Sequence, residues 1–482
     1  MKHVAVDIGA NGGTVFAGSI ETGRLDVAEI YRFDNRPTET NGRYVWELSR
    51  LLDGIETGLS LAAEELDGVD TVGIDTWGLD FGLLRDGEPM GDPYSYRDPA
   101  VSETRDVITD AVGKRSIFDA TGLNHWNTPN TLWQYHALAE NEPDRLADAD
   151  RLLMMPQLLT YLLGGDPVTE VTVASTTQML DPRRRTWNTD LLNDLSLPTE
   201  PLPPLREPGS TAGTVSAEYL PSEPELVLPA SHDTAAAVAG MPLSDGAAFL
   251  STGSWFILGL VASRPNRSAA AYEAGLSNEL GFDDTVRLLK NVNGFFLLEE
   301  CRWAWEEHGE SASYEELIAA ARDVPAKMTL IDPDAETFSI DGEMPERIAD
   351  YCRETGQAVP ETKGETVRCL LDSLAVKTAV ALDEIASVTG RDPSTLHVGG
   401  GGVRNELFCR TLADATGRVV RAGPTEATAT GNLLTQAVAA GSLPDLETGR
   451  ELVEATTNIR TYEPTSSGWD DAKTTMRELA SR

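Results

Sequence analysis

The stretch "AVDIGANGGT" (residues 5–14) joins a short apolar run to an aspartate and a loop with three glycines. The apolar run predicts a buried strand. The small residues after it predict a hairpin turn whose N–H groups can face an anion. The loop has neither the G-x-G-x-x-G spacing of dinucleotide-binding turns nor the G-K-[ST] ending of a P-loop. A plain tight turn is the alternative interpretation.

The segments that follow predict an α/β fold. Strands are expected at residues 3–9, 13–20 and 29–35, a helix with apolar residues at helical spacing at 47–66, and a further strand at 71–78. A strand, a hairpin, a helix and another strand are typical of an α/β layer.

A similar order returns later in the chain. "GAAFLSTGSWFILGLV" (246–261) is expected to form two strands around a small polar turn, and "TLHVGGGGVRNELFCRTLADATG" (395–417) a strand, a glycine loop and a helix. Two halves with similar hairpins predict a duplicated domain with a cleft between the copies. We place the domains at 1–245 and 246–482.

The charge of the chain is unusual. It has 77 Asp and Glu against 39 Lys and Arg, a net charge of −38, and only 7 of the basic residues are lysine. An acidic surface on a core of ordinary composition suits molar salt, where the Debye length is about 3 Å and self-repulsion is screened. We therefore expect a halophilic protein, with an ordinary acidic enzyme as the alternative. Nucleic acid is not an expected partner, because its binding needs a basic patch.

The sequence gives no sign of secretion or of a membrane. A strand is expected at the first residues, no apolar run reaches the roughly 18 residues of a membrane span, and a cytoplasmic location is expected. None of the four cysteines belongs to a C-x-x-C pair, so a zinc site is not expected. Cys352 and Cys369 lie close enough in the sequence to bridge, but a cytoplasmic location favours free thiols.

Two further small-residue turns are candidates for nucleotide contacts. "STGSW" (251–255) repeats the polar hairpin turn, and residues 399–402 are four consecutive glycines between a strand and a helix. Such a run is costly in conformational entropy, which favours a backbone that lies flat against a nucleotide base and ribose. A flexible connection is the alternative.

Two polar turns are candidates for the chemistry. "PASHDTAAAV" (229–238) places Asp233 between a strand and a helix, where its carboxylate can accept a proton from a hydroxyl that attacks a phosphate. Capping of that helix by Ser231, Asp233 or Thr234 is the alternative. "GIDTWGLDFGLL" (73–84) places an aromatic residue beside carboxylates, which suits a sugar platform, although Trp77 in the core is the alternative.

Together these motifs resemble the FGGY carbohydrate kinases of the actin/hexokinase superfamily. The resemblance extends in order from residue 4 to residue 432, and it is carried by "VAVDIGA" (4–10), "GIDTWGLDFGLL" (73–84), "YRD" (96–98), "ASHDTAAAV" (230–238), "LSTGSW" (250–255), "LLKNVNGFFLLEE" (288–300), "VGGGGVRNELFCRTLAD" (398–414) and "AGPTEATATGN" (422–432).

The resemblance implies two ribonuclease-H-like domains that close on ATP and Mg²⁺, with Asp233 as the general base and Asp7 holding Mg²⁺, directly or through water. The sugar contacts that it implies are Gly78, His232, Thr234 and Asn291, to which the quoted motifs add Asp75, Trp77 and Arg97. The ATP contacts that it implies are Ala10, Asn11, Gly12, Gly13, Thr14, Ser254, Glu299, Gly400, Gly401 and Asn405.

The expected acceptor is the C1 hydroxyl of L-rhamnulose. Family members that act on this sugar typically have Ser-Ser-Gly-Arg where this chain has residues 11–14 "NGGT", so the phosphate charge must be met without that arginine. Ser254 replaces a threonine and keeps the hydroxyl, whereas Glu299 replaces a glutamine with a carboxylate. Fuculose, xylulose, ribulose or glycerol is the alternative acceptor.

Two other functions stay open at this point. One is an actin-like ATPase that acts on protein partners, against which the sugar motifs at 73–84 and 230–234 speak. The other is a sugar sensor without activity, for which the missing arginine is the only support. The sequence does not decide between a monomer and a homodimer.

Overall fold

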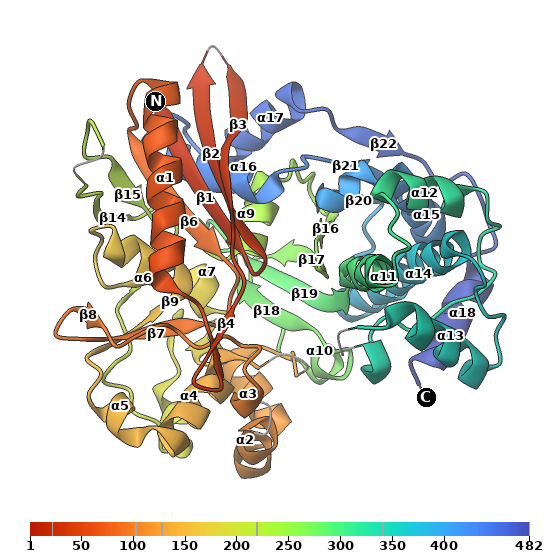
Figure 1. The fold of residues 1–482 in the computed structure, drawn as a ribbon, viewed down its shortest axis with the longest axis horizontal. Coiled ribbons are helices and arrows are strands. Elements are labelled where there is room, and N and C mark those ends of the chain that lie inside the picture. The colour runs from red at the N-terminus through yellow and green to blue at the C-terminus, as the bar shows by residue number, and fades with distance from the viewer. Residues whose placement is uncertain (22, 102–103, 127–128, 218–219, 339–341, 482) are drawn as a thin grey trace. The chain divides into compact units, whose positions relative to one another are not determined.

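The computed structural model describes the chain apart from residues 22, 102–103, 127–128, 218–219, 339–341 and 482 (Figure 1). The chain divides into two compact units. The first consists of Met1–Pro242, Val261–Leu288 and Ala427–Thr457, and the second of Leu243–Leu260, Leu289–Glu426 and Asn458–Arg482. Two segments of the C-terminal half therefore belong to the first unit. A domain boundary near residue 245 and a cleft between the domains stay predictions.

A six-stranded sheet forms the centre of the first unit, and the expected α/β class is confirmed. Its strand order is β14-β15-β6-β1-β2-β3. The antiparallel strands β1 to β3 form the meander that the sequence predicts, and β6 and β15 extend the sheet in parallel pairs. The strands are β1 (Lys2–Gly9), β2 (Gly12–Glu21), β3 (Arg24–Asp34), β6 (Thr71–Thr76), β14 (Thr211–Thr214) and β15 (Glu225–Val227).

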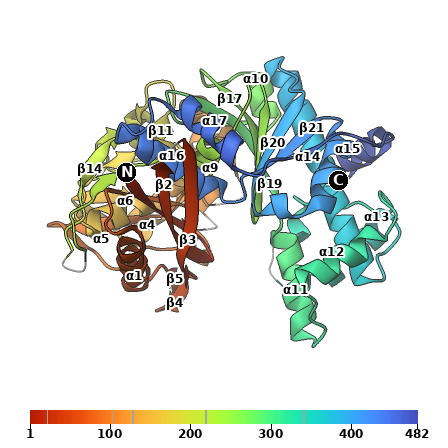
Figure 2. The ribbon, with the colours of Figure 1, turned by 90° about the horizontal axis from the view of Figure 1, so that it is seen from above.

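Helices cover both faces of this sheet (Figures 1 and 2). The side chains of β1 alternate between the faces, as a strand requires. Val4, Val6 and Ile8 join the core under α1 (Leu48–Leu66), whereas Ala5 packs with residues of α16 (Ala427–Ala439). The second helix on the α16 side is α9 (Asp233–Gly240).

The helices α9 and α16 lie unusually close together. A Cβ on Gly431 would lie 1.8 Å from the carbonyl oxygen of Ala236, and one on Gly240 would lie 2.3 Å from that of Ala427. Only glycine at these two positions allows the approach, because a side chain would have to occupy the backbone of the neighbouring helix. The close packing ties α16 to the helix that begins at Asp233.

The other elements of the first unit surround this core. They are β4 (Thr38–Thr40), β5 (Arg43–Val45), β7 (Phe81–Arg85), β8 (Glu88–Pro89), α2 (Thr104–Val112), α3 (Lys114–Thr121), α4 (Thr131–Asn141), α5 (Pro143–Ala147), β9 (Arg151–Met154), α6 (Met155–Leu162), β10 (Thr169–Glu170), α7 (Val171–Ala174), β11 (Leu180–Asp181), β12 (Thr186–Trp187), α8 (Thr189–Asp194), β13 (Leu205–Arg206), α10 (Ala269–Glu273), β18 (Ser277–Leu280) and α17 (Leu446–Thr456).

The second unit repeats the pattern of a hairpin beside parallel strands, as the sequence predicts. Strand β16 (Ala248–Thr252) is antiparallel to β17 (Trp255–Ala262) and parallel to β20 (Thr395–Gly400). Strand β21 (Val419–Ala422) continues the parallel pairing, and β22 (Arg460–Tyr462) closes this edge in the antiparallel sense. Strand β19 (Val286–Asn293) also enters this unit.

In the described part of this unit, six helices accompany these strands, among them the long α14. They are α11 (Phe296–Glu307), α12 (Tyr314–Arg322), α13 (Met344–Thr355), α14 (Lys363–Thr389), α15 (Glu406–Thr416) and α18 (Asp470–Leu479). All four cysteines are buried free thiols, as expected. Across the described ranges, no helix is long and apolar enough to cross a membrane.

Candidate active site

Two carboxylates face each other on neighbouring strands of the first unit. The parallel register of β1 and β6 pairs Asp7 with Asp75, which is fully buried. Asn432 of α16 donates from Nδ2 to Asp75 Oδ2 over 2.5 Å. Burial raises the pKa of Asp75 well above its ordinary value, the charges of Asp7 and Asp233 raise it further, and the hydrogen bond from Asn432 opposes the rise. The charges of Asp7, Asp75 and Asp233 thus interact here.

The turn that carries Asp233 continues from the same sheet. The Thr76 N–H donates to the Ser231 carbonyl over 3.0 Å, and Thr76 and His232 form a parallel bridge. Helix α9 begins at Asp233, so the N-cap is His232, whose side chain makes no capping bond. The predicted capping by Ser231, Asp233 or Thr234 is therefore wrong.

The two oxygens of Asp233 have different surroundings. Oδ1 accepts from the Thr234 N–H over 2.5 Å and from its hydroxyl over 3.1 Å. Within the described part of the chain, no hydrogen bond or ion pair reaches Oδ2. The side chain is about one-third exposed. One oxygen is thus fixed by its neighbours, and the other is free to accept a proton.

A second buried carboxylate holds the main chain of this turn. Glu170 accepts from the Thr172 N–H over 2.7 Å, from the Thr172 hydroxyl over 2.5 Å and from the Ser231 N–H over 3.0 Å. The Thr172 hydroxyl in turn accepts from the His232 N–H over 3.3 Å. Burial raises the pKa of Glu170 to about 7, although these hydrogen bonds oppose the rise.

Trp77 lies in the core, which is the alternative that the sequence left open. Its ring centroid is 4.4 Å from that of Trp46, and both indole N–H groups donate to Asp80 Oδ2, over 3.0 and 2.7 Å. Gln134 donates to Asp80 Oδ1 over 2.9 Å. Burial raises the pKa of Asp80 to about 6, with the indole and amide donors opposing the rise. A sugar contact by Trp77 stays a prediction.

Gly78 and Arg97 have different surroundings. A Cβ on Gly78 would lie 2.7 Å from Thr176 Oγ1, so a larger residue does not fit at this turn. Arg97 is exposed, and its Nε donates to the Tyr96 hydroxyl over 3.1 Å. Burial raises the pKa of Tyr96, and the charge of Asp233 acts in the same direction. The charge of Asp233 thus acts on the Tyr96 hydroxyl, a residue that the sequence analysis did not assign to the site.

The first hairpin turn is tight. Gly9 pairs with Gly12, and Asn35 donates from Nδ2 to the Gly9 carbonyl over 2.8 Å. A Cβ on Gly13 would lie 2.2 Å from the ring of Phe33, so this glycine allows packing between β2 and β3. The other predicted phosphate contacts lie at the tip of the hairpin and on β2: Ala10, Asn11 and Thr14.

In the second unit, the β16–β17 turn meets the start of α11. The Ser254 carbonyl accepts from the Gly294 N–H over 2.9 Å and from the Phe296 N–H over 3.3 Å. Glu299 lies in the first turn of α11 and pairs with Arg302 over 2.7 Å. The fold thus places the predicted ATP contacts Ser254 and Glu299 on adjoining segments.

The glycine run has a packing role as well as an open position. Gly400 has a φ of +85°, and a Cβ there would lie 2.4 Å from the Thr252 carbonyl oxygen. The Gly402 N–H donates to Thr252 Oγ1 over 3.0 Å. By contrast, a Cβ on Gly401 would meet nothing within 4 Å. Close approach to β16 accounts for Gly400 and Gly402, and Gly401 is the open position of the run.

The two remaining predicted residues are asparagines. Asn405 is buried and caps α15, because its side chain accepts from the Phe408 N–H over 3.0 Å and donates to the Tyr314 hydroxyl over 3.0 Å. Asn291 lies on β19. Asn405 therefore has a structural role, and an adenosine contact by it stays a prediction.

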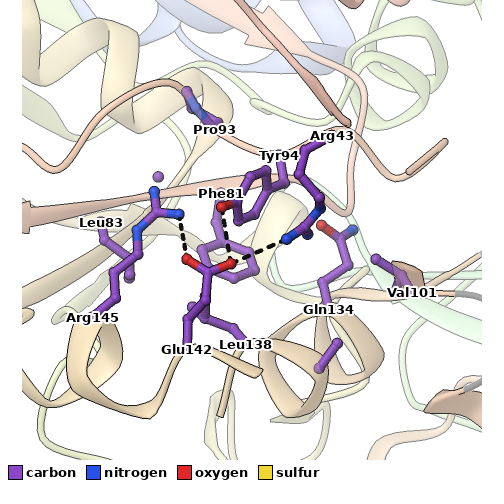
Figure 3. Close-up of a pocket in the computed structure, with 12 residues that line it drawn as sticks. Arg43, Phe81, Leu83, Pro93, Tyr94, Val101, Gln134, Leu138, Glu142 and Arg145 are labelled. Atoms are coloured by element: carbon purple, nitrogen blue, oxygen red, sulfur yellow. Dashed lines mark hydrogen bonds and ion pairs between the residues drawn. The ribbon is translucent and has the colours of Figure 1, made fainter. Parts of the chain in front are cut away.

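One enclosed cavity in the first unit is lined by none of the predicted site residues (Figure 3). Its volume is about 20 Å³, which is room for about one water molecule. Glu142 accepts from Arg43 over 3.1 Å, from Arg145 over 3.0 Å and from the Tyr94 hydroxyl over 2.9 Å. The cavity is too small for a sugar. The ion-paired cluster that lines it stabilises the fold.

The fold also brings together residues that the sequence analysis missed. These are Tyr96, Glu170, Glu279, Arg287 and Asn432. Glu279 lies in "SNEL" and Arg287 in "VRLLKNVN", strands that hold other polar residues, so neither charged residue stands out in the sequence. No local signal marks Glu170 either.

The donor set at β1 and β6 fits Mg²⁺. Mg²⁺ binds through one or two carboxylates and keeps several waters, and Asp7 and Asp75 supply such oxygens on neighbouring strands. Within the residues that the structure describes, no group of three or more His, Cys, Asp or Glu side chains is arranged to hold a metal ion by itself.

Comparison with known proteins decides the family. Residues 4–240 match the N-terminal domain of the FGGY family of carbohydrate kinases, and residues 248–440 match its C-terminal domain. The chain belongs to this family. The resemblance inferred from the motifs is confirmed.

Curated relatives align with this chain over nearly its whole length. A rhamnulokinase of Bacteroides thetaiotaomicron is 37% identical over 476 residues, which cover 97% of each chain. A rhamnulokinase of Bacillus subtilis is 33% identical over 470 residues, which cover 96% of each chain.

Solved structures confirm the two-domain fold. A ligand-bound xylulose kinase from Lactobacillus acidophilus superposes with a TM-score of 0.80 at 14% identity, over 99% of this chain and 96% of that one. A glycerol kinase from Plasmodium falciparum with ADP has a TM-score of 0.77 at 16% identity, over 99% of this chain and 97% of that one.

Glu170→Gln should change how stability depends on pH. Because burial raises the pKa of Glu170 from 4.5 to about 7, its favourable contribution is complete below the lower value and is lost as the pH rises through the higher one. Glutamine stays neutral, so the melting temperature of the variant should rise relative to wild type between about pH 5 and pH 8. Calorimetry at fixed ionic strength measures this difference, with the exposed Glu140→Gln as control. A constant difference across this range would contradict the assignment.

Proposed function

We propose that this kinase transfers the γ-phosphoryl group of ATP to the C1 hydroxyl of L-rhamnulose. The observation that carries the chemistry is the asymmetric carboxylate of Asp233: Oδ1 is held by Thr234, and Oδ2 is open within the described residues. Similarity to rhamnulokinases over nearly the full length supports the choice of sugar.

Asp233 is the general base of the proposed reaction. Its Oδ2 accepts the proton of the C1 hydroxyl as that oxygen forms a bond to the γ-phosphorus, and the bond from phosphorus to the bridging oxygen of ADP breaks. Asp233 is the first residue of α9, where the helix dipole favours the ionised carboxylate before the reaction.

ATP and Mg²⁺ are the proposed cofactors. Asp7 would hold Mg²⁺, directly or through water. Bound there, Mg²⁺ would neutralise charge on the phosphates. The backbone N–H groups of the first hairpin would bind phosphate oxygens in place of the missing arginine. In the second unit, the proposed ATP contacts are Ser254, Glu299, Gly400, Gly401 and Asn405.

The sugar contacts are proposed on the turns that follow β6 and precede α9. His232 and Thr234 flank the base, and Gly78 packs closely against Thr176 on the turn after β6. Asn291, Asp75, Trp77 and Arg97 complete the proposed set. Arg97 is the weakest member because its guanidinium is exposed and bonded to Tyr96.

A different ketose or a polyol is the second candidate for the acceptor. The hairpin "NGGT" at residues 11–14 differs from the usual rhamnulokinase sequence, and structures of xylulose and glycerol kinases share the fold. This candidate keeps the same base and the same cofactors.

A substrate panel with purified protein tests the proposal. ADP release should be fastest with L-rhamnulose among L-rhamnulose, L-fuculose, D-xylulose, L-ribulose and glycerol. Asp233→Ala should lower kcat by about 10²–10⁴-fold, because the base is lost. Asp284→Ala is the matched control, since this aspartate lies in the same unit and its side chain is 85% exposed. Full activity of Asp233→Ala would contradict the assignment of the base, and preference for another sugar would contradict the substrate.

We also propose that the kinase works in the cytoplasm of a halophile. The 77 acidic residues against 39 basic ones support this, because such an excess keeps a protein hydrated and dispersed where salt screens its repulsion.

The activity and the melting temperature should therefore increase with salt. We expect both to rise from about 0.1 M to about 3 M KCl, since the Debye length falls from about 10 Å to a few Å and repulsion between carboxylates weakens. Coupled assays and calorimetry over a KCl series measure the two quantities. Maximal activity and stability at the lowest salt would contradict the halophilic assignment.

A further inference from the structure

His232 lies between the proposed base and a buried ion pair. On one side, Nε2 is 3.3 Å from Asp233 Oδ1. On the other side, Nδ1 is 3.2 Å from Arg287 Nη2 and 3.3 Å from Glu279 Oε2. All four residues belong to the first unit, although Arg287 follows His232 by 55 positions in the sequence.

The ion pair is firmly anchored. The Arg287 side chain is fully buried, and its Nε and Nη2 donate to the Leu280 carbonyl over 3.2 and 3.1 Å. Nη2 lies 3.0 Å from Glu279 Oε2, so the buried guanidinium has an anionic partner. Burial, the largest single influence, would raise the pKa of Glu279, but the charge of Arg287 together with the neighbouring His232 and His125 lowers the value to about 2. The pair therefore stays charged.

The contact with Arg287 determines which ring nitrogen carries the proton. A guanidinium only donates hydrogen bonds, so a ring nitrogen that faces it must offer a lone pair. In a neutral imidazole the proton then lies on Nε2, which faces the Asp233 carboxylate. The opposite tautomer would set a proton of Nδ1 against the guanidinium and a lone pair of Nε2 against Oδ1. Glu279 Oε2 also lies 3.3 Å from Nδ1, but among the described residues this oxygen takes part in no hydrogen bond, whereas the guanidinium does bond to Nδ1.

We infer that Arg287, held by Glu279, is a positioning residue that keeps His232 in the Nε2–H tautomer and thereby fixes Asp233. With its proton on Nε2, His232 presents a donor 3.3 Å from Oδ1, the oxygen that also accepts from the N–H and hydroxyl of Thr234. The Oδ2 atom is then directed to the attacking hydroxyl. This inference rests on the proposed function for its catalytic consequence, but the tautomer can be measured without a substrate.

Ring-nitrogen NMR of the full chain tests the tautomer. The protein is labelled with ¹⁵N-histidine, and the signal of His232 is assigned by its loss in His232→Gln. In wild type we expect a protonated Nε2 and an unprotonated Nδ1. In Arg287→Met, the donor to Nδ1 is gone, and we expect a shift toward the Nδ1–H form. A wild-type Nδ1–H tautomer, a doubly protonated ring, or an unchanged tautomer in Arg287→Met would overturn the inference.

Two other variants control for damage to the fold. Arg450→Met removes another arginine of the first unit, whose guanidinium donates to the carbonyls of Val238 and Ala239 instead of to His232. It should leave the His232 signals unchanged. If Arg287→Met does not fold, Arg287→Lys tests the same contact: it keeps the charge and a donor, and should keep the Nε2–H form. Loss of that form in Arg450→Met or in folded Arg287→Lys would contradict the inference.

Kinetics then test the consequence for Asp233, with the sugar that the panel identifies. Arg287→Met should lower kcat by about 10–100-fold, with the KM for ATP changed less than about twofold. Arg287→Lys should recover part of kcat. Unchanged kcat in Arg287→Met would overturn the positioning role. Absence of activity in wild type would count against the proposed function, while the NMR result would still decide the tautomer.

Discussion

The parallel register of β1 on β6 is the constraint on which the site depends. It sets Asp7 opposite Asp75 in the middle of a sheet whose faces are covered by helices. Two carboxylates in such a place repel each other unless a donor or a cation is close. Asn432 supplies the donor from α16, and the remaining negative charge suits Mg²⁺ and the phosphates that it accompanies.

The helices on one face of this sheet connect that constraint to the base. Gly240 and Gly431 let α9 and α16 approach until backbone meets backbone, so Asn432 and the start of α9 belong to one rigid packing unit. Glu170 accepts a hydrogen bond from the Ser231 N–H and so fixes the main chain just before α9. Residues that do not contact the substrate thus fix the position of Asp233, as the positioning of a general base requires.

The sequence predicted the elements better than it predicted the contacts. The apolar run in "HVAVDIG" and the small residues of both hairpins identify strands and turns because local patterns determine them. The local sequence offered Ser231, Asp233 or Thr234 as the N-cap of α9, whereas the helix begins at Asp233 and His232 is the cap. The pairing of His232 with Glu279 and Arg287 joins distant segments, so no local pattern encodes it.

A crystal structure with L-rhamnulose, Mg²⁺ and a non-hydrolysable ATP analogue tests the central claim most directly. The account predicts that the C1 hydroxyl oxygen lies within about 2.6–3.2 Å of Asp233 Oδ2, the distance at which a base can accept the proton. It also predicts that Oδ1 keeps its bonds to Thr234. A C1 hydroxyl bound to another side chain, or held by Oδ1 with Oδ2 turned away, would contradict the account.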